Sequence, residues 1–350
     1  MKKTFTEILN KSLIHNMKKD KKIICYGLGI NDPKNIFGTT RDLKKIFSEK
    51  RVFDTPTSEN CMTGVGVGLA VAGFKPIMVH QRMDFFLLAF DQLINNAAKW
   101  SFMFGNQIKV PFVIRLIVGR GWGQGPTHSQ SFHNLFANIP GLKVVTPCFP
   151  EDVPGLLNMS LDANSVVIFI EHRWCHQLVS SKKINYKSKK KINSSNHLSK
   201  GKDITIASFS YSTIEVMMAY EKFKDLNISV DHISLNTIKP LDYLSLSNSI
   251  KKTKNLLFFD NMSNPDCSIG DTVISKLQEK FKDKKYSYKN LTLPDRANPT
   301  SYKLSNKHYL SQKDLVDEVI RLLNRKKTYK KKLNFYSNKD VPNKNFKGPF

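Results

Sequence analysis

Short apolar runs rich in β-branched residues alternate with longer segments of helical periodicity along the first half of the chain. The runs that predict buried strands are 21–29, 75–80, 110–119, 142–147 and 166–172, and the segments that predict helices between them are 63–73, 87–103 and 151–162. Such an alternation is typical of a parallel sheet with helices on both faces. We therefore expect a doubly wound α/β domain over residues 1–180.

The same alternation restarts after a lysine-rich interruption. Residues 181–202 carry eight lysines and no acidic residue, and we predict a basic linker there. Strands are then expected at 203–210, 228–235 and 255–260, and helices at 212–226, 241–253, 271–283 and 311–327. The pattern predicts a second doubly wound α/β domain over residues 203–325, followed by a basic tail at 326–350.

The net charge does not change the prediction of two globular α/β domains. The chain of 350 residues is 40% hydrophobic, enough for a globular core, and its formal net charge is +26. Residues 325–350 contain nine Lys or Arg against one acid, Asp340, so the linker and the tail hold more than half of the excess charge. Solvated, unconstrained segments explain such runs without a nucleic-acid partner. Nucleic-acid binding through the tail is an alternative, and it would weaken steeply with salt.

Cysteine spacing and hydropathy exclude further classes of protein. The five cysteines are scattered and form no C-x-x-C pair, which argues against a disulfide framework and against a zinc site. The first twenty residues have the apolar spacing of an amphipathic helix rather than of a signal peptide. No run reaches the ~18–20 apolar residues that span a bilayer. We expect a cytoplasmic protein without a membrane anchor.

Glu59 is the first candidate for chemistry. It comes after Pro56, which disfavours helix at Thr55, and after Ser58, which is predicted to cap the glycine- and alanine-rich helix that follows. The carboxylate is thus expected at a helix start among small residues, and an ordinary first-turn acid favoured by the helix dipole is the alternative. Glycines 64, 66 and 68 have the wrong spacing for a dinucleotide fingerprint and indicate tight helix packing.

The segment PTHSQSFHN holds two histidines after a glycine-rich turn. His128 is expected where a parallel strand ends, which is the edge where open α/β sheets bind ligands. A solvated loop histidine is the alternative, and we interpret His133 as structural. Upstream, Phe85 and Phe86 are predicted to be core aromatics by default. The polar residues at 91–96 need hydrogen-bond partners, either in neighbouring loops or in a second subunit.

Several motifs together resemble a known family. They are, in order, DTPTSE, DFFLLAFDQLINNAAK, THSQ, IPGLKVVTPCFPEDVPGLL and VVIFIEH, followed by DITIASFS, ISLNTIKPLD and KTKNLLFFDN. Their order and spacing over residues 4–325 resemble the beta subunit of the thiamine-diphosphate-dependent decarboxylating component of 2-oxo acid dehydrogenases, of the pyruvate and branched-chain type. The resemblance implies a transketolase-like pyrimidine-binding domain and a transketolase C-terminal-type domain.

The resemblance also implies roles for three residues. Glu59 falls on the glutamate that binds N1′ of the cofactor's aminopyrimidine, and Phe85 falls on the aromatic residue that packs against that ring. His128 falls on the active-site histidine near the substrate carboxylate and the incoming acceptor, where it would stabilise an anionic adduct or donate a proton. No metal-binding role falls on any residue of this chain.

The diphosphate cradle of thiamine-diphosphate enzymes is missing from the sequence. That cradle contains G-D-G, and the only Gly-Asp pair here, Gly270-Asp271, continues into a predicted helix. The resemblance therefore implies that an alpha subunit holds the diphosphate and Mg²⁺ in an α2β2 heterotetramer, and that this chain is inactive alone. It further implies decarboxylation of a 2-oxo acid such as pyruvate and acyl transfer to the lipoyl group of an acyltransferase core.

The sequence departs from the family at several positions. Leu28 and Gly29 replace an acidic pair, Ala163 and Ser165 replace the aspartate and asparagine of a potassium site, Asn236 replaces an arginine, Asp260 replaces a glutamate, and Arg82, Arg120 and Trp122 make the predicted pocket more basic and aromatic. We therefore expect no potassium site, and a bulkier or more anionic substrate or another acceptor. A split transketolase-like or acyloin-forming enzyme with a sugar or aldehyde acceptor is the alternative.

Overall fold

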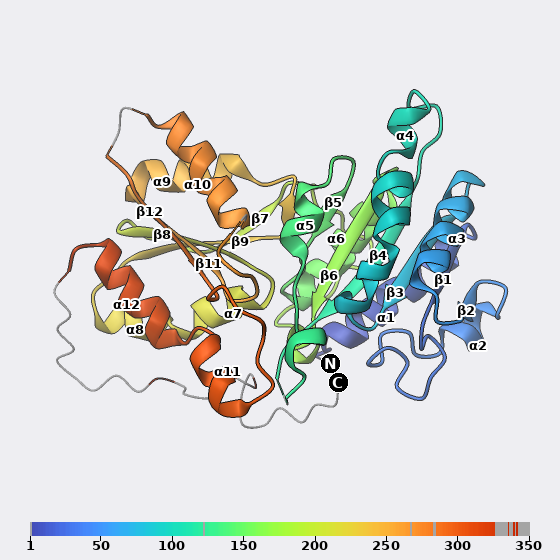
Figure 1. The fold of residues 1–350 in the computed structure, drawn as a ribbon, viewed down its shortest axis with the longest axis horizontal. Coiled ribbons are helices and arrows are strands. Elements are labelled where there is room, and N and C mark those ends of the chain that lie inside the picture. The colour runs from blue at the N-terminus through green and yellow to red at the C-terminus, as the bar shows by residue number, and fades with distance from the viewer. Residues whose placement is uncertain are drawn as a thin grey trace. The chain divides into compact units, whose positions relative to one another are not determined.

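The computed structural model describes residues 2–121, 123–266, 268–282 and 285–325, together with positions 335, 339 and 341. The chain divides into two units: the first contains the described residues up to Val118 and Leu135–Ile192, and the second contains Gly119–Asn134 and the described residues from Asn193 onward. Each unit is built on a mainly parallel sheet with helices, so the predicted fold class is confirmed (Figure 1). Trp122 and most of the basic tail lie outside the described residues.

The first unit contains a parallel sheet with the strand order β5-β6-β4-β3-β1-β2. Two of its strands, β4 and β6, are buried along their whole length. Their sequences are continuous apolar runs because strands that are covered on both faces need them. Each strand predicted in this half contains an observed one, whereas the short β2 was not predicted. The bounds are β1 (Ile23–Gly27), β2 (Val52–Asp54), β3 (Lys75–His80), β4 (Phe112–Val118), β5 (Lys143–Val145) and β6 (Val166–His172).

Helices precede, connect and follow these strands. The first helix has a capping box, in which the Thr4 hydroxyl accepts from the backbone of Glu7 and the Glu7 carboxylate accepts from the backbone of Thr4. Its apolar face packs against α6. The α-helices of this half are α1 (Phe5–Lys19), α2 (Leu43–Phe47), α3 (Glu59–Val71), α4 (Trp100–Met103), α5 (His133–Asn138) and α6 (Val153–Leu161).

Two glycines of α3 differ in their surroundings. A Cβ on Gly66 would overlap the ring of Phe112 and the hydroxyl of Tyr26, whereas a Cβ on Gly68 would have no described atom within 4 Å apart from its chain neighbours and the nearby backbone of its own helix. The predicted tight packing is therefore confirmed at Gly66 and wrong at Gly68. We expect Gly66→Ala to lower the free energy of unfolding by roughly 1–3 kcal/mol through overpacking, and Gly68→Ala to raise it by roughly 0.5–1 kcal/mol because alanine favours helix. Urea unfolding checks both, and equal effects would contradict the close packing of α3.

The helix predicted over residues 87–103 is not a single α-helix. Met83–Ala89 forms the 3-10 helix η1, Gln92–Ala97 forms the π-helical segment η2, and Trp100–Met103 forms the short α-helix α4. The Asn95 side chain donates to Asp91 at 2.8 Å and the Asn96 side chain donates to Gln92 at 3.0 Å. These polar side chains therefore bond one another along the helix, and π-helical segments are frequent at functional sites.

The second unit has the strand order β12-β11-β8-β9-β7. All pairs are parallel except β7 with β9, which is antiparallel. β7 lies within the predicted linker, and its polar, half-exposed sequence SNHLS gave no strand signal because an edge strand needs little apolar surface. The strands are β7 (Ser195–Ser199), β8 (Ile204–Phe209), β9 (Val230–Leu235), β11 (Asn255–Asp260) and β12 (Ser287–Thr292), with the short β10 (Thr237–Lys239) after β9.

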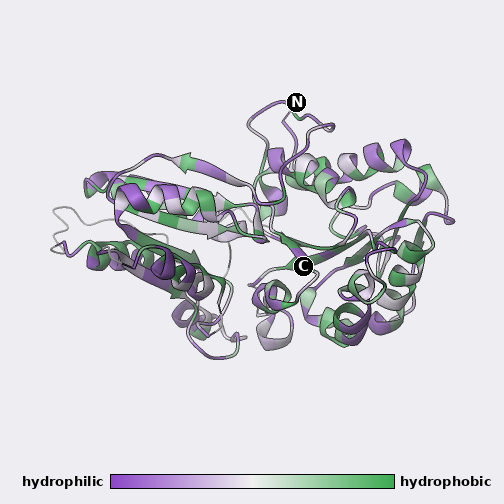
Figure 2. Cartoon of the chain, turned by 90° about the horizontal axis from the view of Figure 1, so that it is seen from above, coloured by the Kyte–Doolittle hydropathy of each residue, from purple (hydrophilic) through white to green (hydrophobic). Residues whose placement is uncertain are grey.

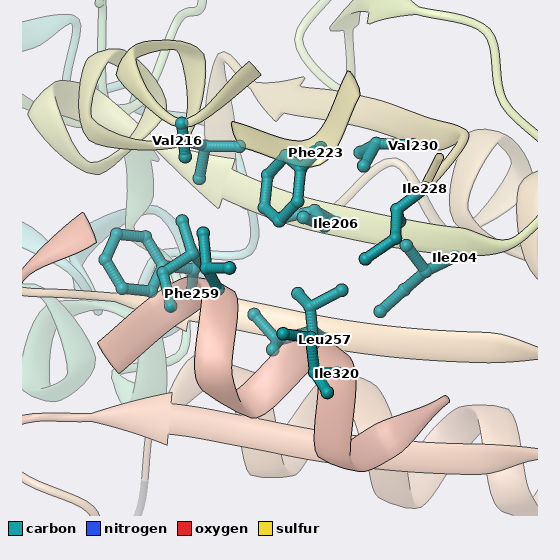
Figure 3. Packing of buried hydrophobic residues seen from close by; sticks show 13 residues of the cluster. Ile204, Ile206, Val216, Phe223, Ile228, Val230, Leu257, Phe259 and Ile320 are labelled. Atoms are coloured by element: carbon teal, nitrogen blue, oxygen red, sulfur yellow. The ribbon is translucent and has the colours of Figure 1, made fainter. Parts of the chain in front are cut away.

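The core of the second unit forms between its sheet and its helices (Figure 3). Ile206 of β8 and Leu257 and Phe259 of β11 pack with Val216 of α7 and Val319 of α12, and all five are essentially inaccessible. Hydrophobic residues are concentrated on the strands, whereas the helices carry both hydrophobic and hydrophilic residues (Figure 2). The helices are α7 (Ser210–Met218), α8 (Tyr220–Asp225), α9 (Tyr243–Thr253), α10 (Ile269–Lys280), α11 (Tyr302–His308) and α12 (Gln312–Leu322).

Candidate active site

Glu59 lies at the carboxyl end of the first unit's short strand β2. That strand ends at Asp54, and Glu59 is the first residue of the helix that follows, α3. Only 6% of Glu59 is exposed, and no described residue hydrogen-bonds to its carboxylate. Ser58 holds the N-cap position, but its side chain makes no capping hydrogen bond, contrary to the prediction. A carboxylate without a partner in the described part of the chain can accept a hydrogen bond from a ligand.

Phe85 belongs to η1, which follows β3 and packs against α3. Its neighbour Phe86 is fully buried, with ring centroids 5.0 Å from His80 and 6.0 Å from Phe136. Phe85 itself is 41% exposed. The default prediction of two core aromatics is therefore confirmed for Phe86 and wrong for Phe85. A partly exposed aromatic side chain can pack against a flat ring.

Two arginines bring positive charge to the same edge of the sheet. Arg82 follows β3 and Arg173 follows β6, the strands on either side of β4. Arg173 is buried, with its guanidinium 4.4 Å from the ring centroid of Phe37. Burial, and to a smaller extent the charge of Arg82, lowers the pKa of Arg173 to about 10. Burial also lowers the pKa of Arg82, and the negative charge of Asp84 opposes that shift. Arg173 was not predicted from the sequence, although its position directly after a buried strand was a usable signal.

A buried ion network joins the two central strands of the first unit. Arg115 of β4 pairs with Glu171 of β6, with Nε–Oε1 at 2.5 Å and Nη2–Oε2 at 2.9 Å, and His176 donates from Nε2 to Glu171 at 3.0 Å. Burial alone raises the pKa of the Glu171 carboxyl, but the Arg115 charge and the hydrogen bonds from His176 and Arg115 lower it to about 2. Burial lowers the pKa of His176, although the Glu171 carboxylate opposes this shift. The network stabilises the strands beneath the candidate site.

The turn before β6, where the sequence predicts no potassium site, contains a cation of the chain itself. The Lys143 ammonium donates to the Ala163 carbonyl at 3.1 Å and to the Ser165 hydroxyl at 2.7 Å. Burial lowers the pKa of Lys143. Since carbonyl and hydroxyl oxygens also coordinate metal cations, the lysine takes up the oxygen ligands that this turn offers.

His128 belongs to the second unit. It follows the short helix η3 (Gly125–Thr127), is half-buried, and has its Nδ1 2.9 Å from the Thr127 hydroxyl. His133 is fully buried, with its Nε2 2.9 Å from an Asp260 carboxylate oxygen, in keeping with its interpretation as structural. Glu59 and Phe85 thus lie on the first unit, and His128 lies on the second.

Arg120, which the sequence assigns to a more basic pocket, makes its side-chain contacts within the second unit. Its Nη2 pairs with Glu215 at 2.7 Å and its Nη1 donates to the Asn261 carbonyl at 2.7 Å. Because these acceptors lie inside the second unit, the guanidinium stabilises that unit.

Among the described residues, no three His, Cys, Asp or Glu side chains gather where they could hold a metal ion. No helix in the described part of the chain is both long and apolar enough to cross a bilayer.

Comparison with known proteins first shows to which class of fold the two units belong. The family model of the transketolase pyrimidine binding domain matches residues 1–175, and that of the transketolase C-terminal domain matches residues 194–316. A solved structure described as a split gene transketolase, inactive beta4 tetramer, has a TM-score of 0.74 at 17% sequence identity, over 92% of this chain and 99% of that chain. The two units therefore have the transketolase-like architecture.

Proteins of similar sequence then show the family within this class. The pyruvate dehydrogenase E1 component subunit beta-1, mitochondrial, of Arabidopsis thaliana is 33% identical over 73% of this chain and 71% of that protein. The pyruvate dehydrogenase E1 component subunit beta of Staphylococcus epidermidis is 31% identical over 79% of this chain and 85% of that protein. The chain belongs to the family of the pyruvate dehydrogenase E1 beta subunits, which confirms the resemblance seen in the sequence motifs.

Proposed function

We propose that this chain is the beta subunit of a heteromeric thiamine-diphosphate-dependent 2-oxo acid dehydrogenase. With an alpha subunit it decarboxylates a 2-oxo acid such as pyruvate and passes the acyl group to a lipoyl acceptor. The observation that carries the proposal is the buried carboxylate of Glu59, which has no hydrogen-bond partner among the described residues. Thiamine diphosphate, when bound, supplies the electron sink for decarboxylation.

Glu59 and Phe85 fit the aminopyrimidine end of that cofactor. The carboxyl group of Glu59, the first residue of α3, makes no hydrogen bond with a described residue and can share a proton with the ring nitrogen N1′. The partly exposed side chain of Phe85 can pack against the flat ring. Both side chains lie on elements of the first unit that pack against each other, α3 and η1. The chain's part in the chemistry is therefore to orient the pyrimidine and to hold its proton.

Exposed apolar side chains of the first unit support assembly with an alpha subunit. Leu88 of η1 and Phe102, Met103 and Phe104 in and after α4 are all exposed, Phe102 by 84%. Exposed apolar surface of this kind marks interaction sites. No cluster of three His, Cys, Asp or Glu side chains occurs among the described residues, and the sequence has no G-D-G cradle. We therefore assign the diphosphate and Mg²⁺ to the alpha subunit of an α2β2 assembly.

His128→Ala in the assembled enzyme is expected to lower kcat by roughly 10²–10⁴-fold, the usual loss when a positioned acid or base is removed. The imidazole is half-buried beside Thr127, so it can stabilise an anionic adduct or donate a proton. Steady-state kinetics with the preferred 2-oxo acid check this prediction. His15→Ala, on α1, is a matched control that should retain full activity. An unchanged kcat in His128→Ala would remove His128 from the proposed site.

The proposal is tested by co-purifying the chain with the alpha-like subunit encoded beside it and measuring CO₂ release. The substrates are a panel of 2-oxo acids with thiamine diphosphate and Mg²⁺, and a lipoyl-domain protein serves as acyl acceptor. Decarboxylation together with reductive acylation of the lipoyl group supports the proposal. Decarboxylation without lipoyl acylation would move the acceptor to another class.

A split transketolase-like or acyloin-forming enzyme is the second candidate. The positive edge formed by Arg82 and Arg173 favours it, because guanidinium groups bind phosphate well. Such an enzyme would use a phosphorylated sugar or an aldehyde as acceptor. Including these acceptors in the same panel distinguishes the candidates, since only the second predicts carbon–carbon bond formation at rates above those of acyl transfer to the lipoyl domain.

A further inference from the structure

The glycine-rich segment Gly119–Asn134 follows β4 of the first unit in sequence, yet it packs as part of the second unit. It carries His128, and four sets of contacts tie it to β11, α7, α10 and the loop before α11. We propose that the second unit positions His128, with Glu215 and Asp260 as positioning residues that hold the segment on either side of the histidine. This inference rests on the role proposed for His128 above.

The contact before His128 is made by Arg120. Its Nη2 lies 2.7 Å from Glu215 of α7, its Nη1 donates to the Asn261 carbonyl at 2.7 Å, and its guanidinium lies 4.3 Å from the ring centroid of Tyr309. Arg120 is buried, and Glu215 is buried nearly as far. Removing the charge of Glu215 would leave a buried guanidinium without its counter-charge, so the segment would be released at this end.

The contact after His128 is made by His133. Both of its ring nitrogens are engaged, Nε2 with Asp260 at 2.9 Å and Nδ1 with the Ser131 hydroxyl at 2.8 Å. Asp260, at the end of β11, also accepts from the Ser263 hydroxyl at 2.5 Å and from the Met262 backbone at 3.0 Å. Because His133 and Asp260 are fully buried and their groups are paired, the ring orientation is set by the second unit.

The residues next to His128 are held as well. The Asn298 side chain donates to the Ser129 carbonyl at 2.6 Å, and its own oxygen accepts from His308 at 2.9 Å. Gly125 has a φ of +67° and lies so close to Thr300 that a Cβ would overlap the threonine hydroxyl. A segment held at both ends and beside the histidine keeps the imidazole in one place. Misplacement of a catalytic group by about 1 Å can cost about 10²-fold in rate.

Amide hydrogen exchange of the full chain tests the anchoring without any assay of activity. Glu215→Gln and Asp260→Asn are expected to speed exchange in peptides covering residues 119–134 and to leave peptides of β8 unchanged. Asp231→Asn is the matched control, because Asp231 is also buried in the second unit, pairs with Lys252 at 2.7 Å and makes no contact with the segment. Unchanged exchange in the segment for both variants would overturn the inference.

A mutant cycle tests whether the anchoring serves His128. In the assembled enzyme, Glu215→Gln and Asp260→Asn are expected to lower kcat about 10–100-fold with KM changed less, Glu215→Asp to recover part of the loss, and Asp231→Asn to keep the wild-type kcat. In a His128→Ala background the two positioning variants should have no further effect. Losses that multiply with that of His128→Ala would overturn the positioning role. If His128→Ala alone changes nothing while exchange responds as expected, the proposed function of His128 fails and the anchoring stands.

Discussion

Glu59→Gln in the assembled enzyme is expected to reduce decarboxylation by about 10²–10⁴-fold, the range associated with loss of a proton-transfer group. The amide has nearly the same shape as the carboxyl group but cannot exchange a proton with N1′ of the aminopyrimidine. The same change should leave the melting temperature unchanged or slightly higher, because the carboxylate makes no hydrogen bond with any described residue. A group that serves function without contributing stability is expected to behave in this way.

Two measurements on the same preparation check this prediction: the initial rate of CO₂ release and the melting temperature. Glu49→Gln is the control, since the side chain of Glu49 is 77% exposed and its ion pair with Lys44 is long, at 3.6 Å. It should keep both the rate and the melting temperature. A Glu59→Gln enzyme with the wild-type rate would mean that Glu59 is an ordinary first-turn acid. A large fall in melting temperature would mean that its carboxylate stabilises the fold.

Glu171→Ala is expected to give the largest loss of stability, about 3–5 kcal/mol in the free energy of unfolding. The carboxylate is fully buried and paired with Arg115 at 2.5 Å, and it also accepts from His176. Removing it leaves the Arg115 guanidinium buried between β4 and β6 without its counter-charge. Urea unfolding at neutral pH measures this loss. The control is Asp162→Ala, whose ion pair with Lys189 is largely exposed and should be worth less than about 1 kcal/mol.

The contribution of Glu171 should also depend on pH. Its pKa is about 2 in the folded protein against an ordinary value of 4.5, so folding favours the ionised form. The stabilisation is therefore fully present above pH 4.5 and is lost as the pH falls towards 2; the shift corresponds to roughly 3 kcal/mol. The difference in stability between the wild type and Glu171→Ala should shrink when measured at pH 3 rather than pH 7. An equal difference at both values would contradict the ion pair.

The sequence predicted the buried strands well and the other elements less well. β4 and β6 consist of continuous apolar residues because both faces of the sheet are covered, and that pattern is visible in one dimension. β7 was missed because an edge strand can be polar and short. The succession of 3-10, π and α segments between residues 83 and 103 packs against α3 through η1 and η2. Periodicity does not encode such contacts.

The residues of the candidate site also differ in how far the sequence could predict them. Glu59 and His128 could be found because a helix start and a strand end are local features. Family motifs then gave these residues roles that remain proposals. The pairing of Arg120 with Glu215 and of His133 with Asp260 joins residues far apart in sequence, and single-sequence reasoning has no access to such pairs. Arg173 shows the intermediate case, since its position after a strand was visible but its proximity to Arg82 was not.

The affinity for thiamine diphosphate, measured by titration calorimetry in the presence of Mg²⁺, shows whether this chain and an alpha subunit share the cofactor. The complex of this chain with its alpha subunit should bind the cofactor, the chain alone should bind it far more weakly, and Glu59→Gln in the complex should weaken binding. This result would support a chain that holds the pyrimidine end while the partner holds the diphosphate. A wild-type complex that binds no thiamine diphosphate would contradict the account.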